Sequence, residues 1–226
     1  SPDGSKLSYI DRFRKLHVID TATGRERVVE GEVDRGDAYA WSPDGRSIAY
    51  PDLRSTLFRN LAIYSLDLGK STILTDGIGD AHRPAFSRDG SALYFLGSTN
   101  AGKAKTGLDL SVLAHMNDVS WSVYKVNLSG GGIERLPIPA VRYADVLAAA
   151  EGALFLTEDP GESTFAGKRR LARYDPGTRK IEPFLADVDE LELSANGNTI
   201  LYRSDSAWGV VPIDKTPAAG AGKIDL

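Results

Sequence analysis

A short turn motif returns along the chain at nearly regular intervals, and this repeat limits the possible folds more than any other feature. Copies start at positions 1, 42, 87, 149 and 194; they read Ser-Pro-Asp-Gly twice, then Ser-Arg-Asp-Gly, Ala-Ala-Glu-Gly and Ser-Ala-Asn-Gly. Successive starts lie 41, 45, 62 and 45 residues apart. Three of these four gaps match the period of roughly 40–45 residues that is typical of a four-stranded propeller blade.

An alternating strand follows each turn. Apolar residues two positions apart bury one face of a strand, and such pairs follow all five turns: Leu7 and Tyr9, Ile48 and Tyr50, Leu93 and Phe95, Leu154 and Leu156, and Ile200 and Tyr202. We predict that the next strand has one register in all copies, with these residues aligned: Leu16, Ile63, Val123, Leu171 and Val210, then Ile19, Leu66, Val126, Tyr174 and Ile213. In this register His17 aligns with Tyr64 and Tyr124, which predicts a structural role for His17.

Each repeat is predicted to run from an inner strand through the turn to a second strand, a third strand and an outer strand. We expect inner strands at 37–41, 82–86, 142–147 and 188–193, and outer strands at 26–29, 71–75, 133–136 and 181–185. The first repeat lacks its inner strand, and the last is predicted to stop after its third. The predicted fold class is all-β: a β-propeller of four-stranded antiparallel blades, to which residues 1–226 contribute about five blades of a larger propeller.

Two segments depart from the repeat. The 62-residue gap contains an insertion at about 97–120, which opens with Gly, Ser, Thr and Asn, as irregular loops do. Long loops are often functional, and a surface loop packed on its own side chains is an equal alternative. Residues 215–226 are rich in Ala and Gly and are predicted to form a C-terminal linker. Terminal blades with an uncovered face should make the chain prone to association.

Composition and charge argue against several classes of protein. The chain has no cysteine, which excludes disulfides, thiolate metal sites and a cysteine nucleophile. Its net charge is −4 and it has no basic stripe, so a nucleic-acid partner is not expected, because phosphate binding needs clustered cations. No apolar run approaches the roughly 20 residues that span a bilayer, so no membrane partner is expected either.

The residues that catalysis requires are also sparse. The Gly-x-Ser-x-Gly pattern of a nucleophile elbow does not occur in the sequence. The three histidines are His17, His82 and His115, and no two of them have the spacing of metal ligands on one element. We therefore predict that these residues include no catalytic group, no metal site and no cofactor site.

Peptide contacts are predicted at the starts of two inner strands. The polar or basic residues there are His82, Arg83, Arg142 and Tyr143. A positive group in this position could hold a peptide carboxylate through charge-assisted hydrogen bonds. The alternative is that these side chains pair with carboxylates of neighbouring blades.

One stretch of the chain resembles the tricorn protease family, especially its bacterial members. The resemblance is carried by residues 60–66, 69–72, 74–77, 80–81, 84–86, 89–90 and 93–95. Parts of the insertion, at 98–102, 106–109 and 122–124, resemble that family as well. The turn motif by itself is shared with TolB-like and prolyl-oligopeptidase propellers.

The resemblance implies a segment of the seven-bladed propeller in a cytoplasmic, homo-oligomeric serine peptidase that trims peptides. In that family the catalytic residues follow the propeller in mixed α/β segments, beside a PDZ-like domain. The implied function is a non-catalytic propeller that admits peptides or guides them to the catalytic core. The implied partners are peptide substrates and the PDZ-like and catalytic domains of the parent peptidase.

Two other functions are compatible with the repeat. A TolB-like propeller would act as a docking scaffold for protein partners, and an export signal before it would favour that function. A propeller that caps an α/β-hydrolase peptidase would need its hydrolase elsewhere in the polypeptide. The tricorn-like stretch between positions 60 and 95 favours the first function over both.

Overall fold

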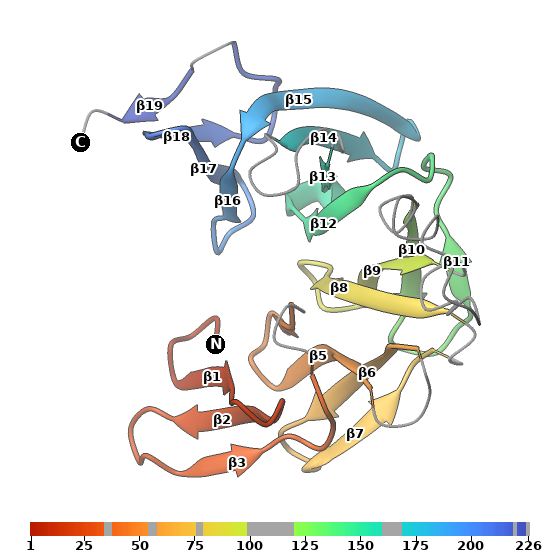
Figure 1. The fold of residues 1–226 in the computed structure, drawn as a ribbon, viewed down its shortest axis with the longest axis vertical. Helices are drawn as coiled ribbons and strands as arrows, with labels where there is room; N and C mark the ends of the chain where they lie inside the picture. Colours follow the sequence, from red (N-terminus) through yellow and green to blue (C-terminus); the bar gives the residue numbers. More distant parts are fainter. Residues whose placement is uncertain are drawn as a thin grey trace, which may run out of the picture. The chain divides into compact units, whose positions relative to one another are not determined.

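The regular secondary structure of the described residues is almost entirely antiparallel β-strand (Figure 1). The computed structural model describes residues 1–33, 38–53, 58–75, 79–98, 120–159, 169–218 and 221–224. The single helical element among them is a short 3-10 turn, Ala150–Gly152. Five sheets follow one another along the chain, and strands that are consecutive in sequence pair within each sheet. The all-β class and the antiparallel sheets predicted from the repeat are confirmed.

The sheets belong to two compact units. Residues 1–108 and 123–136 form the first unit, and residues 109–122 and 137–226 form the second. The first unit contains these three sheets: β1 (Lys6–Ile10), β2 (Leu16–Asp20) and β3 (Glu26–Val28); β4 (Ala40–Trp41), β5 (Ser47–Asp52), β6 (Asn60–Ser65) and β7 (Lys70–Ile73); β8 (Asp80–Phe86), β9 (Ala92–Ser98), β10 (Ser122–Asn127) and β11 (Ile133–Arg135). The second unit contains these two: β12 (Tyr143–Ala148), β13 (Leu154–Glu158), β14 (Arg169–Asp175) and β15 (Lys180–Val188); β16 (Glu190–Leu193), β17 (Thr199–Ser204), β18 (Ala207–Pro212) and β19 (Lys223–Ile224).

The repeated turn is built by the residues that define the motif. In the third sheet, the N–H of Gly90 donates to the carbonyl of Ser87 at 2.9 Å. The Ser87 hydroxyl donates to Asp89 Oδ1 at 2.6 Å, and the N–H of Ser91 donates to the same oxygen at 3.1 Å. Gly90 has a φ of 71°, a left-handed conformation that glycine adopts without steric cost. The turns that start at positions 1, 42 and 194 repeat these contacts.

The first and last sheets differ in how they match the repeat. As predicted, the first sheet has three described strands and lacks an inner one. The prediction that the last repeat stops after its third strand is wrong, because β19 pairs with β18 as an outer strand. This strand lies inside residues 215–226, which were predicted to form only a linker. Most of the predicted insertion, residues 99–119, lies outside the described residues, and so does His115.

The predicted common register of the third strands also needs correction. Equivalent positions are marked by one backbone hydrogen bond to the carbonyl of the residue just before the second strand of the repeat; its donors are the N–H groups of Thr21, Leu66, Leu128 and Ile213. This hydrogen bond aligns Leu66 with Thr21, and not with Ile19 as predicted. The predicted alignment of the second and fifth repeats with the other repeats is therefore wrong by two residues. His17 consequently matches Ala62 and Tyr124. A shift of two keeps every side chain on its face, and period-two patterning therefore cannot detect it.

Apolar faces of consecutive sheets form the core of each unit. In the first unit, Leu16 and Val18 pack with Ile48 and Tyr50 of the second sheet, and all four are at most 3% exposed. A second cluster joins the second and third sheets and includes Leu61 and Phe95. In the second unit, Phe155 and Leu171 pack with Ile200 and Tyr202. Each of these sheets therefore buries one face against the sheet that follows it in the chain.

Candidate functional site

The start of the inner strand β8 carries a buried ion pair. Asp80 is 5% exposed, and its Oδ1 accepts a hydrogen bond from the N–H of Arg59 at 2.7 Å. The Arg59 guanidinium donates to Asp80 Oδ2 at 3.4 Å. One carboxylate thus holds both the backbone and the side chain of the residue just before β6. A buried charge is tolerated when it is paired and hydrogen-bonded in this way.

His82 follows on the same strand and is uncharged at neutral pH. Burial disfavours the imidazolium, and the cations Arg83 and Arg59 disfavour it further, so the pKa of His82 is lowered to about 3. Of the two polar residues predicted here, only Arg83 therefore carries positive charge at neutral pH.

Arg83 has an unusual backbone. Its φ is 53°, in the left-handed region, although a proline follows it at position 84. The pairing of β8 with β9 shifts register between His82 and Ala85, so Arg83 lies in a β-bulge. Bulges re-aim side chains, and non-glycine residues in the left-handed region cost roughly 1–3 kcal/mol and cluster at functional sites. Arg83 and Asp187 are the residues with this conformation inside the described strands.

The candidates at the start of β12 have partners in the segments next to β12 and β13. The Arg142 guanidinium donates to Asp159 Oδ2 at 3.2 Å. Tyr143 is 3% exposed, and its hydroxyl donates to the carbonyl of Pro139 at 3.0 Å. Burial, with a smaller contribution from Glu158, raises the pKa of Tyr143 to about 12. Each of the two predicted pairs, on β8 and on β12, lies in its own unit.

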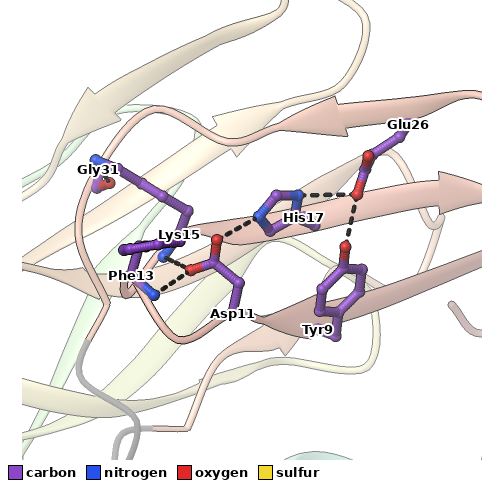
Figure 2. Close-up of polar contacts among 7 residues, drawn as sticks. All are labelled: Tyr9, Asp11, Phe13, Lys15, His17, Glu26 and Gly31. Atoms are coloured by element: carbon purple, nitrogen blue, oxygen red, sulfur yellow. Dashed lines mark hydrogen bonds and ion pairs between the residues drawn. The ribbon is translucent and has the colours of Figure 1, made fainter.

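A polar cluster on the first sheet was not predicted from the sequence (Figure 2). His17 on β2 lies between two carboxylates: its Nδ1 is 2.9 Å from Glu26 Oε1 and its Nε2 is 3.1 Å from Asp11 Oδ2. The Tyr9 hydroxyl also donates to Glu26 Oε1, at 2.6 Å. The rings of Tyr9 and His17 stack, with centroids 4.8 Å apart. The polar atoms of this cluster therefore satisfy one another.

The same contacts set the charges in the cluster. Backbone N–H groups, with that of Lys15 first, and then His17 hold the pKa of Asp11 below its usual value. The hydrogen bond from Tyr9 and the contact with His17 lower the pKa of Glu26. The carboxylate of Glu26 in turn raises the pKa of Tyr9. Both acids are thus ionised at neutral pH, and Tyr9 keeps its proton.

The sequence contained a partial signal for both clusters. Asp11 and Asp80 lie immediately beside strands, where a carboxylate can accept backbone N–H groups. The pairing of strands determines which cation or imidazole each carboxylate contacts. Residues 9, 17 and 26, for example, are neighbours only because β1, β2 and β3 pair in this register. Over the described residues, no group of three or more His, Asp or Glu side chains is placed to hold a metal ion.

Comparisons with known proteins identify the fold and its relatives. No family model matches the chain. Tricorn protease homolog 1 of Streptomyces coelicolor is 23% identical over 269 aligned residues, which cover 95% of this chain and 25% of that protein. The crystal structure of the tricorn protease matches all of this chain with a TM-score of 0.76 at 17% identity, over 25% of its own length. The chain has the β-propeller fold and is similar to part of the tricorn protease. The predicted fold class and the predicted resemblance are both confirmed.

Two further proteins are similar to this chain. TolB from Acinetobacter baumannii matches 96% of the chain and 52% of its own length, with a TM-score of 0.65 at 19% identity. The uncharacterized protein Atu1656 of Agrobacterium fabrum is 29% identical over 142 residues, which cover 60% of this chain and 41% of that protein. The chain thus spans a quarter to two fifths of the curated relatives it matches. Within its described residues, no helix has the length and apolarity to cross a membrane.

Proposed function

We propose that this chain is a non-catalytic propeller segment of a longer serine-type peptidase, and that it admits peptides or guides them to a catalytic core. The observation that carries the proposal is the match of the whole chain to one quarter of the tricorn protease. In the proposed protein, PDZ-like and catalytic domains are the partners of the propeller in the same polypeptide. The protein is proposed to be cytoplasmic and homo-oligomeric, and to need no cofactor in these residues.

Arg83 is the residue we propose to contact peptides. Arg83 combines positive charge with a bulged, left-handed backbone on an inner strand. Its neighbour His82 carries no charge at pH 7. A guanidinium can bind a carboxylate through two parallel hydrogen bonds, so the C-terminal carboxylate of a peptide is the proposed ligand group.

Peptide binding tests this assignment directly. Fluorescent peptides of six to ten residues are made with a free or an amidated C-terminus, and their binding to the chain is followed by anisotropy. We expect the free acid to bind at least about tenfold more tightly than the amide, because a charge-assisted pair is lost with the amide. Arg83→Gln should remove this preference, whereas the matched variant Arg142→Gln should retain it. Equal binding of the two peptides, or the same loss in both variants, would contradict the assignment.

Peptidase activity tests the wider proposal. The chain alone is expected to cleave no peptide, and deletion of its residues from the longer protein should change the preferred substrate length. Cleavage by the chain alone would overturn the non-catalytic assignment. An unchanged length preference after deletion would overturn the guiding role.

A TolB-like docking scaffold is the second candidate, favoured by the match to TolB over 96% of the chain. In this function the propeller binds a folded protein and has no preference for free peptide carboxylates. Equal binding of the free-acid and amidated peptides, together with isolation of a folded protein in complex with the longer protein, would favour the scaffold over the guiding role.

A further inference from the structure

A groove lies between the second and third sheets, at the end where their repeated turns lie. Its volume is about 460 Å³, within the range of roughly 300–1,000 Å³ that is typical of small-ligand sites. Its apolar wall is formed by Ile63, Leu74, Phe86 and Leu128. Both sheets belong to the first unit, so the groove is formed by the interior of this unit's blade pair. We call it the open groove.

Two carboxylates line the open groove beside its apolar wall. They belong to Asp44 and Asp89, the third residues of the turns of the second and third sheets. A hydrogen bond from Ser42 lowers the pKa of Asp44, and hydrogen bonds from the serines on either side lower the pKa of Asp89 to about 2. Both acids are therefore ionised at neutral pH. None of the described residues that line the groove is basic, so its charge is negative.

The equivalent place between the first and second sheets holds an arginine. Arg27 of β3 pairs with Val18, whose side chain packs against the second sheet, so Arg27 faces that sheet as well. Its Nη1 donates to the carbonyl of Leu66 at 2.7 Å. Leu66 and Leu128 are equivalent residues of the second and third sheets, as their backbone hydrogen bonds show. An arginine thus reaches the carbonyl that corresponds to the carbonyl of Leu128.

The second sheet has a short side chain where the first sheet has this arginine. Ile63 and Val18 are equivalent, because each precedes the N–H donor that marks the register by three residues. Val18 pairs with Arg27. Ile63 pairs with Thr72, and Thr72 lines the open groove. The open groove is therefore the space that an arginine side chain fills one sheet earlier in the chain.

We propose that the open groove binds the arginine side chain of a peptide. The methylene groups of this side chain lie on Ile63 and Phe86, and its guanidinium donates to the carbonyl of Leu128 and to the carboxylate of Asp89. These two acceptors lie at the same end, because the N–H of Leu128 donates to the carbonyl of Ser91, whose N–H donates to Asp89 Oδ1. Arginine suits the site because it joins an apolar stem to a planar fork of five donors.

This proposal rests on the proposed function in one respect, which is that the ligand is a peptide. It names a class of peptide, those with an arginine inside their sequence. Arg83 is proposed to bind the carboxylate at the end of a peptide, and the open groove binds a side chain instead. The groove therefore depends neither on Arg83 nor on a catalytic core.

A pair of peptides tests the open groove directly. Both have about eight residues and an amidated C-terminus, which removes the carboxylate proposed for Arg83. One carries a central arginine and the other carries citrulline, an uncharged analogue of nearly the same shape. We expect the arginine peptide to bind at least about tenfold more tightly by fluorescence anisotropy, because citrulline cannot form a charge-assisted pair. Equal binding of the two peptides, or no binding of the arginine peptide, would overturn the proposal.

Filling the groove from within the chain is the sharpest variant. Thr72→Arg copies the arrangement of Arg27 and should abolish the preference for arginine over citrulline, because the space and the Leu128 carbonyl are then taken. Leu68→Arg adds the same charge at an 81% exposed turn position of the same sheet and should retain the preference. Circular dichroism checks that both variants fold. The same preference in both variants would overturn the assignment to this groove.

The carboxylates are tested without loss of their turns. Asn196 accepts the same turn hydrogen bonds in the fifth sheet, so Asp44→Asn combined with Asp89→Asn removes charge and keeps the turn structure. We expect this double variant to bind the arginine peptide at least about tenfold more weakly and the citrulline peptide unchanged. Asp3→Asn, the matched change in the first turn, should have no effect on either peptide. Unchanged binding of the arginine peptide by the double variant would overturn the proposal.

Arg83→Gln separates this proposal from the proposed function. This variant should lose the preference for a free C-terminus and keep the preference for arginine over citrulline. Thr72→Arg should show the opposite pattern. Loss of both preferences in either single variant would mean that the peptide has one binding site, and would overturn the assignment of the open groove as a site of its own.

Discussion

His17 and His82 have the same side chain in the same unit, yet their surroundings are opposite. His17 lies between the carboxylates of Asp11 and Glu26 (Figure 2). His82 is half-buried on an inner strand, and desolvation, followed by the cations Arg83 and Arg59, lowers its pKa to about 3. One imidazole therefore joins a network of acids, and the other is held neutral by burial and cations.

The contrast shows where the first unit can interact with charged ligands. Around His17 both imidazole nitrogens, the Tyr9 hydroxyl and the Asp11 carboxylate have partners within the cluster or the backbone, so that region contributes stability (Figure 2). Around His82 lie two cations, Arg59 and Arg83, and Asp80 pairs with Arg59. We expect anionic groups to bind near β8, where Arg83 lies in the bulge, and not near β2.

The largest expected effect comes from the acid on the His82 side. Asp80→Ala leaves the Arg59 guanidinium and its N–H without their buried acceptor, and should lower the free energy of unfolding by about 2–4 kcal/mol. Asp11→Ala on the His17 side should cost clearly less, because Asp11 is closer to solvent. Urea denaturation of both variants measures the difference; equal losses would break the comparison.

The second effect is a pH dependence specific to His82. Its pKa is lower in the folded protein than in the unfolded chain, so the unfolded state binds the proton more tightly and stability is lost as pH falls below about 6.5. At pH 5 the loss is about 2 kcal/mol at most, from 1.36 kcal/mol per unit. His82→Leu should flatten the unfolding free energy between pH 7 and 5. An unchanged slope in this variant would mean that His82 is not the group that titrates.

The third effect concerns the hydrogen bonds of His17. His17→Phe keeps an aromatic ring on Tyr9, as Tyr124 does on Phe95 in the third sheet, but removes both contacts with carboxylates. We expect a loss of about 1–2 kcal/mol in unfolding free energy by urea denaturation. The matched variant Tyr124→Phe should lose less. A neutral or stabilising His17→Phe would show that ring stacking, not hydrogen bonding, is what His17 contributes.

The smallest effect belongs to the repeated turns. Hydrogen bonds from Ser87 and Ser91 lower the pKa of Asp89 to about 2, and Ser42 lowers that of Asp44. These folded-state values lie below the unfolded ones, so their stabilisation is complete above about pH 4 and is lost as pH falls toward 2. Thermal unfolding of Asp89→Asn should show a weaker dependence on pH between 4 and 2 than wild type. Because Asp89 does not titrate between pH 7 and 5, where the effect of His82 is measured, the two effects can be separated.

Local chemistry made much of the fold predictable. The turn residues and the period-two strands each depend on neighbours within a few positions, so the blades and their order could be derived from the repeat. The error of two residues in the second and fifth repeats arose because a slip by two leaves the pattern of faces unchanged. The outer strand β19 was missed because two residues paired to β18 give no pattern of their own.

The candidate site was less predictable than the fold. The sequence drew attention to the starts of β8 and β12, but it treated His82 and Arg83, and Arg142 and Tyr143, as equivalent pairs. Burial and partners separate them: His82 is neutral, Arg142 is paired, Tyr143 is covered, and Arg83 lies in a bulge. That Arg83 contacts peptides stays a prediction.

The sequence by itself determined the repeat, the turns that begin each second strand, and the alternation that makes each sheet two-faced. These properties follow from interactions within one or two strands. Only the tertiary structure decided which face is covered, and hence why Tyr50 is fully buried while the equivalent Tyr9 is exposed. It also decided which charges meet, as at His17 and His82, because burial and electrostatic neighbours depend on strands that lie far apart in sequence and adjacent in space.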